Sequence, residues 1–367
     1  ASETGSGANE ENKYLKVFYK TDNNPETEFD VNGINMGNWG TVYSEQDSLT
    51  GEVLQVIVYM NNHYANDKVI LDEIIVNGIA EIVPIEKGDL VINEVLFNPV
   101  PEGADYVEIY NLSGKEIPLS QLYLASRNKY LELTQIYPVS ISRKMFMPED
   151  YLVLTKDTNG VFPWFTIQCA DCFMQMDKFP SFNNDDDYVV LLNEEFEVID
   201  ELFYNEKMHS PILADREGVS LERISFFENT NKPENWFSAS TESGYGTPGY
   251  INSQIENEIY KTPEVTFTPE AFSPNNDGFN DEYKISYQLE KSGYILNARI
   301  FDSAGRYIMQ LAKNDIAGTD GELIWNGEDE SGTRQPLGVY VVVVELFDLN
   351  GNVKRFKDGI VLTDVFQ

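Results

Sequence analysis

The sequence predicts an all-β protein made of tandem β-sandwich modules, and three observations favour this fold class. Short apolar runs with the two-residue periodicity of strands recur along most of the chain. Clusters of Asn, Asp, Gly and Pro separate these runs, as turns separate the strands of a sandwich. No segment keeps a 3.6-residue apolar stripe for three helical turns, so we expect few helices.

Ten segments are predicted as strands from this periodicity. Tyr283–Leu289 alternates apolar and polar residues, which indicates a strand with one buried face. Val339–Phe347 is apolar at both parities and rich in valine, which indicates a central strand covered on both faces. The other eight are Leu15–Lys20, Val53–Met60, Val69–Val76, Leu90–Phe97, Tyr106–Asn111, Tyr151–Thr155, Tyr188–Leu192 and Val198–Tyr204.

Two polar segments, Ile85–Asp89 and Ile251–Pro263, are predicted as linkers. They divide the chain into expected modules at residues 10–87, 88–253 and 264–363. A chain of 367 residues has room for two or three domains of roughly 100–200 residues each. The opening Ala1-Ser-Glu-Thr-Gly is small and polar, like a linker and unlike a signal peptide, so we expect a mature or clipped product.

The charge balance limits the classes of partner. The chain has 26 Lys and Arg against 61 Asp and Glu, a formal net charge of −35. Such a surface repels phosphates, which argues against nucleic-acid binding and against docking on anionic lipid through a basic face. A hydrophobic content of 42% with 13% aromatic residues is nevertheless typical of a folded chain. No run of about 18 apolar residues occurs, so no membrane-spanning segment is expected.

Cysteine and histidine are scarce, which restricts metal and nucleophilic chemistry. Cys169 and Cys172 lie in one Cys-Ala-Asp-Cys motif, for which a local disulfide, free thiols, a redox pair and a metal site remain open. The two histidines, His63 and His209, are too few for a zinc site of ordinary ligand count. His209 precedes Ser-Pro and is predicted as a turn residue with no recognisable catalytic serine beside it.

Residues 88–253 carry a set of spaced motifs, namely Ile92–Pro99, Asp105–Asn111, Ser220–Ile224, Asn235-Trp236 and Gly246–Gly249. In this order they resemble the lamin-tail domain in the form found in secreted proteins of Bacteroidetes. The resemblance implies an immunoglobulin-like β-sandwich that serves as a non-catalytic attachment or interaction module.

Glu94 and Glu108 each stand inside an apolar strand, and two interpretations remain open. Paired carboxylates are the usual equipment for acid–base chemistry. Alternatively, the two carboxylates cap loops or pair with a base such as Arg223, because buried carboxylates need partners. Strand alternation places Glu222 on the opposite face from Arg223.

Residues 264–363 carry a second set of motifs, namely Thr268–Asp281, Ala298–Arg306, Trp325–Gly332 and Pro336–Tyr340. They resemble the immunoglobulin-like domain of the flagellar hook-capping family and the gliding-motility-associated C-terminal domain of Bacteroidetes exoproteins. The resemblance implies a type IX secretion signal, with the translocon or outer-membrane shuttle proteins as partners. It therefore implies a location outside the cell or on the outer-membrane surface.

Two oxygen-rich loops are candidate calcium sites. Asn275, Asp277, Asn280 and Asp281 surround a glycine turn, and calcium takes six to eight oxygen ligands of this kind. Asp185 and Asp187, in the segment 183–187, form the second candidate. The alternatives are an Asx turn for the first loop and solvated charge for the second. Calcium is thus the one cofactor that the sequence suggests.

Residues 10–87 match no family that we can name. Their aromatic side chains would form a sugar-stacking platform if they converged on one face; otherwise they pack in the core. These residues are Tyr14, Tyr19, Trp39, Tyr43, Tyr59 and Tyr64.

Together, the sequence predicts a secreted or cell-surface protein that is not an enzyme and acts in adhesion, assembly or scaffolding, with surface proteins or glycans as further partners. The alternative is a glycan- or polymer-binding accessory part of a larger extracellular hydrolase. A third hypothesis, an enzyme within these residues, rests only on Glu94 and Glu108.

Overall fold

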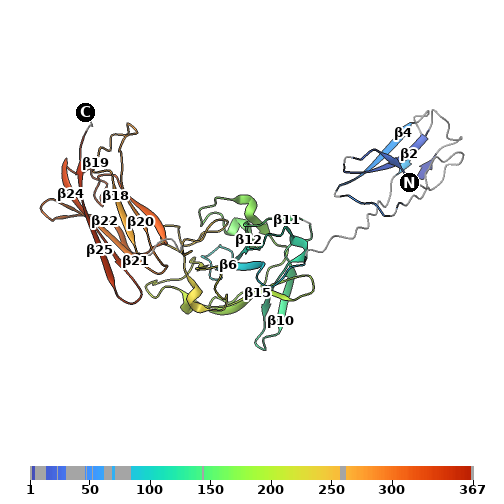
Figure 1. Cartoon of the computed structure of the whole chain (residues 1–367), viewed down its shortest axis with the longest axis horizontal. Coiled ribbons are helices and arrows are strands. Elements are labelled where there is room, and N and C mark those ends of the chain that lie inside the picture. The colour runs from blue at the N-terminus through green and yellow to red at the C-terminus, as the bar shows by residue number, and fades with distance from the viewer. Residues whose placement is uncertain are drawn as a thin grey trace. The chain divides into compact units, whose positions relative to one another are not determined.

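The computed structural model describes residues 2–4, 14–22, 24–29, 46, 48–51, 53–61, 68–70, 84–142, 144–256 and 262–364. The chain divides into two compact units, Ala1–Glu81 and Ile82–Gln367. Every regular element in the described residues is a β-strand or a single 3-10 turn, which confirms the predicted all-β fold class (Figure 1). No helix within the described ranges is long and apolar enough to cross a membrane.

The first unit contains an antiparallel three-stranded sheet of β3 (Thr27–Glu28), β2 (Tyr14–Thr21) and β4 (Leu54–Asn61). A second pair joins β1 (Ser2–Thr4) to β5 (Lys68–Ile70). The predicted strands at Leu15–Lys20 and Val53–Met60 correspond to β2 and β4.

The register of this sheet separates two of the predicted platform residues. Tyr19 lies opposite Val56, and Tyr59 lies opposite Lys16. Because residues directly opposite share a face and successive residues alternate, Tyr19 and Tyr59 face opposite sides of the sheet. These two tyrosines therefore do not converge. Trp39, Tyr43, Tyr64 and the side chain of Tyr14 lie outside the described residues, as does His63.

The second unit begins with a sandwich at residues 84–256, which we call the first sandwich. Its larger sheet has the order β13 (Phe173–Gln175), β12 (Tyr151–Thr155), β7 (Tyr106–Asn111), β6 (Leu90–Leu96), β16 (Leu221–Arg223), β17 (Trp236–Ser238). Its smaller sheet has the order β10 (Leu133–Pro138), β9 (Tyr123–Arg127), β14 (Asp186–Leu192), β15 (Val198–Asn205). A short pair, β8 (Ile117–Pro118) and β11 (Met145–Phe146), lies beside them. Five 3-10 turns connect the strands: Leu119–Gln121, Thr158–Gly160, Ala170–Cys172, Glu206–Met208 and Pro233–Asn235.

The core of the first sandwich lies between the two sheets. Ile92 and Ile109 of the larger sheet belong to the same buried cluster as Leu124 and Leu191 of the smaller one. All seven residues of β6 are buried, which explains its continuous apolar character. The side chain of Ile85 belongs to this cluster too, so the segment predicted as a linker at Ile85–Asp89 begins inside the domain.

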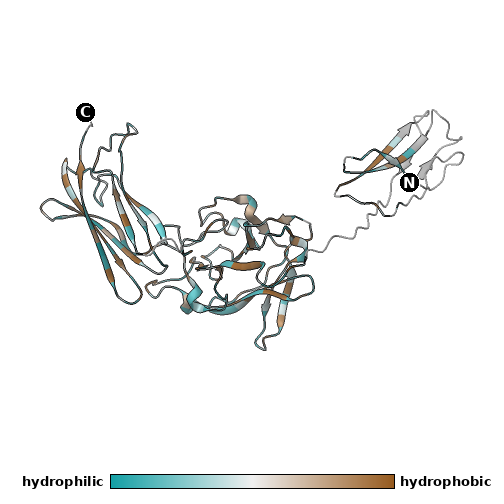
Figure 2. Ribbon diagram, in the orientation of Figure 1, coloured by the Kyte–Doolittle hydropathy of each residue, from teal (hydrophilic) through white to brown (hydrophobic). Residues whose placement is uncertain are grey.

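The second sandwich, at residues 262–364, packs a three-stranded sheet against a five-stranded one. The first has the order β18 (Glu264–Thr268), β20 (Tyr283–Gln288), β23 (Asp320–Trp325). The second has the order β19 (Ala271–Phe272), β25 (Val353–Leu362), β24 (Gly338–Phe347), β21 (Ile295–Asp302), β22 (Tyr307–Ile316). Their shared core includes Trp325, which packs between the sheets against Phe272 and Tyr340. Hydrophobic and hydrophilic residues alternate along these strands (Figure 2).

The two sandwiches meet through an apolar cluster and a hydrogen-bonded segment. Phe237 and Ile224 of the first pack with Ile295 and Ile316 of the second. The chain from Ile251, predicted as a linker, is built into this contact. Gln254 is buried and donates from Nε2 to the carbonyl of Ala317 at 3.0 Å.

Candidate functional site

Three glutamates lie side by side on the larger sheet of the first sandwich, on the face that points away from the core between the sheets. Glu94 of β6 is directly opposite Glu108 of β7 on one side and Glu222 of β16 on the other. All three have an exposed fraction of 0%. We call this set the glutamate row. Three carboxylates in adjacent positions repel one another and lose their hydration, so they need donors.

The segment 245–254 supplies donors to the centre of the row. Glu94 accepts from the backbone N–H of Thr247 at 2.9 Å and from its hydroxyl at 3.1 Å. The hydroxyls of Tyr106, at 2.7 Å, and Ser220 also donate to Glu94. Thr247 belongs to the Gly-Thr-Pro-Gly motif of the sequence, so the function of this motif is to close over a buried carboxyl.

The outer two members are held by the same segment. Glu222 accepts from the hydroxyls of Thr247 and Ser253, each at 2.7 Å, and from the backbone N–H of Gln254 at 2.9 Å. Glu108 accepts from the backbone N–H of Gly249 at 2.5 Å. It also accepts from Nδ2 of Asn93 at 2.7 Å, and Asn93 is bonded in turn to Asn252. The row thus holds the segment at Thr247, Gly249, Ser253 and Gln254.

The protonation of the row follows from its geometry. The Thr247 hydroxyl has one proton but contacts both Glu94 and Glu222. It can donate to only one of them, so the other carboxyl must carry a proton and donate to the hydroxyl oxygen. Consistently, burial and the neighbouring Glu94 charge raise the pKa of Glu222 to about 8. Burial also raises the pKa of Glu94, and burial with the Glu94 charge raises that of Glu108 well above its usual range.

These contacts bear on the two interpretations of Glu94 and Glu108. The carboxyls are fully buried and hydrogen-bonded to a loop of their own domain, which supports loop capping. The proposed pairing with Arg223 is wrong, because Arg223 lies on the other face of β16. Its Nη2 forms an ion pair with Asp200 at 3.0 Å, and its Nε donates to the carbonyl of Ile92 at 2.6 Å.

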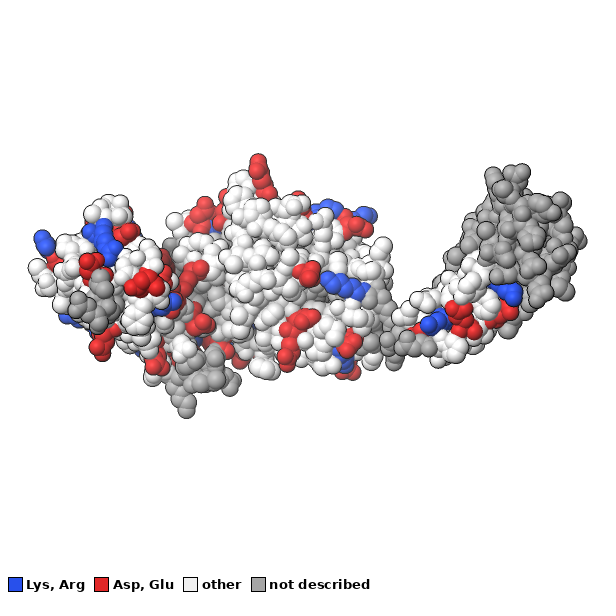
Figure 3. Space-filling model, turned by 90° about the horizontal axis from the view of Figure 1, so that it is seen from above, with Lys and Arg blue, Asp and Glu red and all other residues white. Residues whose placement is uncertain are grey.

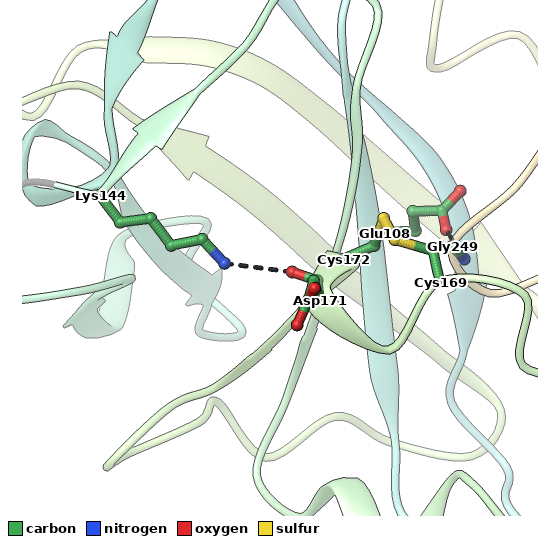
Figure 4. Close-up of a disulfide and its surroundings, with 6 residues drawn as sticks. All are labelled: Glu108, Lys144, Cys169, Asp171, Cys172 and Gly249. Carbon is green, nitrogen blue, oxygen red and sulfur yellow. Dashed lines mark hydrogen bonds between the residues drawn. A yellow bond between two sulfur atoms is a disulfide. The ribbon is translucent and has the colours of Figure 1, made fainter.

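The two cysteines form a disulfide next to the row. Cys169 and Cys172 are joined around a 3-10 turn, with their Cα atoms 5.4 Å apart. Of the alternatives left open by the sequence, the structure therefore has the local disulfide. The bridge lies beside Gly249, the donor to Glu108, and the turn is also held by Lys144, whose Nζ donates to the carbonyl of Asp171 (Figure 4). The disulfide thus encloses the outer end of the row.

His209 stands at a bend, as predicted, but it is buried and has a serine partner that the sequence did not indicate. Its Nδ1 lies 2.9 Å from the hydroxyl of Ser238, which is itself fully buried. Burial lowers the pKa of His209 to about 3. A neutral, enclosed imidazole beside an enclosed hydroxyl fits a packing role.

In both candidate calcium loops the carboxylate oxygens accept hydrogen bonds from nearby backbone N–H groups. Asp281 accepts from the backbone N–H groups of Asn275, Asn276 and Gly278, and Asp277 accepts from that of Phe279. This is the Asx-turn alternative, with Asn280 at φ 50° in the same loop.

In the second loop, Asp187 accepts from the backbone N–H groups of Asn183 and Tyr188, and Asp185 from that of Asp186. No group of three or more His, Cys, Asp or Glu side chains in the described ranges is arranged for a metal. Calcium binding stays a prediction.

Two surface hollows accompany these buried clusters. The larger, of about 520 Å³, is lined by Asp105, Lys156 and Lys178, and burial raises the pKa of Asp105 to about 7. The smaller, of about 180 Å³, is lined by Trp164 and Tyr245 over Pro99 and Val100. Trp164 is 48% exposed. Sequence reasoning missed both hollows, because residues far apart in the chain line them.

Comparisons with known families agree with both resemblances. Residues 84–206 match the family model of the lamin tail domain. Residues 266–362 match that of the CHU_C type IX secretion signal domain, which also supports the Bacteroidetes origin inferred above. The chain therefore carries a lamin tail domain followed by a type IX secretion signal domain. No curated protein matches it.

Among solved structures, the chain is similar to FlgD from P. aeruginosa, at 17% identity over 29% of this chain and 78% of that one, with a TM-score of 0.21. It is similar to CopC from Methylosinus trichosporium OB3b at 13% identity, over 28% of this chain and 98% of that one, with a TM-score of 0.19. For latent PorU from Porphyromonas gingivalis the identity is 10%, over 96% of this chain and 29% of that one, with a TM-score of 0.22.

Proposed function

We propose that this exported chain, which carries a lamin tail domain and a type IX secretion signal domain, is a non-enzymatic surface protein for adhesion, assembly or scaffolding. The secretion signal domain indicates export to the extracellular or outer-membrane surface. The proposal concerns what the chain does there.

One observation carries the proposal. The glutamate row, the cluster of buried acids in the described residues, stabilises the fold. The glutamate row is fully buried, and its oxygens accept hydrogen bonds from the segment that leads to the secretion signal domain. Catalytic carboxylates must reach substrate, whereas these reach Thr247, Gly249 and Gln254.

The acidic surface also supports a solvent-facing structural role. Acidic side chains are spread over the visible face of the described residues, with fewer basic ones among them (Figure 3). A strong net charge keeps a protein soluble and limits self-association.

Attachment of the producing bacterium to surfaces tests this proposal. A strain lacking the gene should attach or assemble less than the parent strain, and the full chain should restore it. Glu94→Gln should restore it equally well, because a neutral amide preserves the fold without acid–base chemistry. Turnover of a glycan, ester or phosphate by the purified chain, lost in Glu94→Gln, would overturn the proposal.

A second candidate, a glycan- or polymer-binding accessory part, is favoured by one observation. Trp164 is half-exposed at the rim of the smaller hollow, with Tyr245 beside it. Aromatic rings present apolar faces to which sugar C–H groups pack. Glycan binding by the purified chain that Trp164→Ala abolishes, and that the exposed control Phe227→Ala leaves intact, would support this candidate.

A further inference from the structure

Strand β24 has an apolar face that the protein itself leaves open. The sequence predicts this strand as central and covered on both sides. Its central position in the five-stranded sheet is confirmed. One face is fully buried, whereas Val341 and Val343 on the other face are only partly buried. Tyr340, Val342 and Val344 are buried in the core, whereas Val339, between them and the strand start, is 51% exposed.

The outward residues of this sheet form rows across four strands. Opposite residues share a face, so the strand register defines the rows. The first row, at the end near the first sandwich, is Ile316, Ile295, Phe347 and Val353, and the second is Lys313, Asn297, Glu345 and Arg355. The third row is Gln310, Arg299, Val343 and Lys357, and the fourth is Tyr307, Phe301, Val341 and Gly359. The fifth row has only Val339 and Val361. We call the last four of these rows the open face.

The open face continues an interface that exists within the chain. In the first row, Ile295, Ile316 and Phe347 belong to the apolar cluster with Phe237 and Ile224 of the first sandwich. The same sheet surface that buries its end against one protein domain therefore extends beyond it, first through a polar and charged row and then through rows that contain Val343, Phe301 and Val341. Val361 is 40% exposed and Tyr307 46% exposed at its far end.

The open face has the opposite charge from the rest of the chain. It carries four cations, Lys313, Arg299, Arg355 and Lys357, and one carboxylate, Glu345. Glu345 is buried and already paired, since Arg299 donates to one of its oxygens and Arg355 to the other at 2.6 Å. A second carboxylate, Glu330, accepts from the hydroxyl of Tyr307 at the edge of the face. Four cations against two carboxylates leave this face locally positive in a chain of net charge −35.

We propose that the open face is a docking surface for a protein partner whose surface has an acidic part beside an apolar part. Val341, Phe301 and the valines at the far end supply the apolar contact, and the lysines and arginines in the two rows nearer the first sandwich attract acidic side chains. Complementary charge steers association, and desolvated apolar residues supply the affinity.

The size of the face suits such a contact. Strands lie about 4.8 Å apart and alternate residues about 6.8 Å apart, so four strands and four rows span roughly 14 Å by 20 Å. That is about 300 Å² for a face that combines apolar and charged side chains. The open face is smaller than one side of a standard protein interface, which is about 800 Å². The contact therefore also includes neighbouring loops or has a modest affinity.

The inference rests on the export that the secretion signal domain indicates, and not on the proposed role in adhesion, assembly or scaffolding. The face belongs to the secretion signal domain, so the partner is expected in the envelope of the producing cell. The test therefore uses the full chain in that cell.

Site-specific photocrosslinking tests the proposal. Val341 is replaced by p-benzoylphenylalanine, intact cells are irradiated, and crosslinked peptides are identified by mass spectrometry. We expect one defined adduct whose crosslinked peptide is acidic. The same probe at Ser286, on the outer side of the three-stranded sheet, should give none.

Charge reversal provides the second readout. Lys313→Glu with Lys357→Glu reverses two cations of the face and leaves the Glu345 ion pairs intact. We expect the adduct yield to fall at least tenfold, with an unchanged melting temperature. The matched control, Lys284→Glu with Arg334→Glu, reverses two cations elsewhere in the domain and should keep the yield.

Several outcomes would overturn the inference. An adduct with a second copy of this chain, or charge-dependent binding of the purified chain to phosphatidylethanolamine–phosphatidylglycerol vesicles, would assign the face to another occupant. An adduct that survives charge reversal, or no adduct at Val341, would reject it too. If deletion of residues 264–367 blocks export while Val341 gives no adduct, the inference fails and the proposed export role stands.

Discussion

The carboxyl groups of Glu94 and Glu222 share one hydroxyl, that of Thr247, at 3.1 and 2.7 Å. Because this hydroxyl has a single proton, one of the two glutamates is held in its protonated form. The relationship joins two strands of the lamin tail domain to the segment that continues into the secretion signal domain.

Stability should depend on the protonation of Glu222. Its pKa is raised in the folded state, from an ordinary value of 4.5 to about 8. The folded state therefore binds more protons than the unfolded state between these values. The contribution of Glu222 to the free energy of unfolding is fully present below pH 4.5 and is lost as the pH rises through about 8. The loss is up to about 1.4 kcal/mol per pH unit.

Glu222→Gln should flatten this dependence, since an amide N–H can donate permanently to the Thr247 hydroxyl. Urea unfolding between pH 5 and pH 9 measures it, with the exposed Glu217→Gln as control. Equal pH slopes in the native chain and in Glu222→Gln would show that Glu222 is not the titrating group.

The Thr247 hydroxyl should be needed by both carboxyls. Thr247→Val keeps the shape of the side chain but leaves two buried oxygens without a partner. We expect a loss of about 2–4 kcal/mol in the free energy of unfolding. Thr241→Val, at a partly buried threonine near the domain contact, provides a comparison of the same chemistry. A loss below that of Thr241→Val would contradict the shared-proton account.

The buried ion pair of Arg223 with Asp200 should be more costly to break than an exposed one. Arg223→Met leaves Asp200 charged and enclosed, for which we expect a loss of about 3–5 kcal/mol. Arg127→Met breaks a partly exposed pair with Glu201 and should cost about 1 kcal/mol or less. Denaturant melts of the two variants compare these costs directly, and similar losses would reject the difference in burial as the cause.

Calcium, if it binds the loop at 275–281, should stabilise the chain weakly. Extracellular calcium modules bind at about 0.1–1 mM. At 10 mM calcium, a site of 1 mM affinity adds about 1.4 kcal/mol. The melting temperature of the chelator-treated chain should then rise by a few degrees, and Asp277→Asn should remove the rise. An unchanged melting temperature and no heat in a titration would leave the Asx turn as the loop's only role.

Much of the fold could be predicted from the sequence because its longer strands are strongly patterned. Leu90–Phe97, Tyr106–Asn111 and Val198–Tyr204 correspond to β6, β7 and β15 within a residue or two at each end. The three-residue strands β13, β16 and β17 are too short for a periodicity, so their pairing was not predictable.

The candidate site was only half predictable for a related reason. Glu94 and Glu108 stand out as acids in apolar strands, but Glu222 joins them only through the register of β16 with β6. The open face was not predicted from the sequence. A run of valines at both parities indicates burial on two sides, whereas Val341 and Val343 on the outward side of β24 are only partly buried and Val339 is exposed.

Export is the central claim, and cell fractionation of the producing bacterium tests it most directly. The full chain and a chain lacking residues 264–367 are expressed in the same strain, and their amounts are compared inside the envelope, on the cell surface and in the medium. The account predicts that the full chain reaches the surface or the medium and that the shortened chain is retained in the envelope. Equal export of the two chains would contradict it.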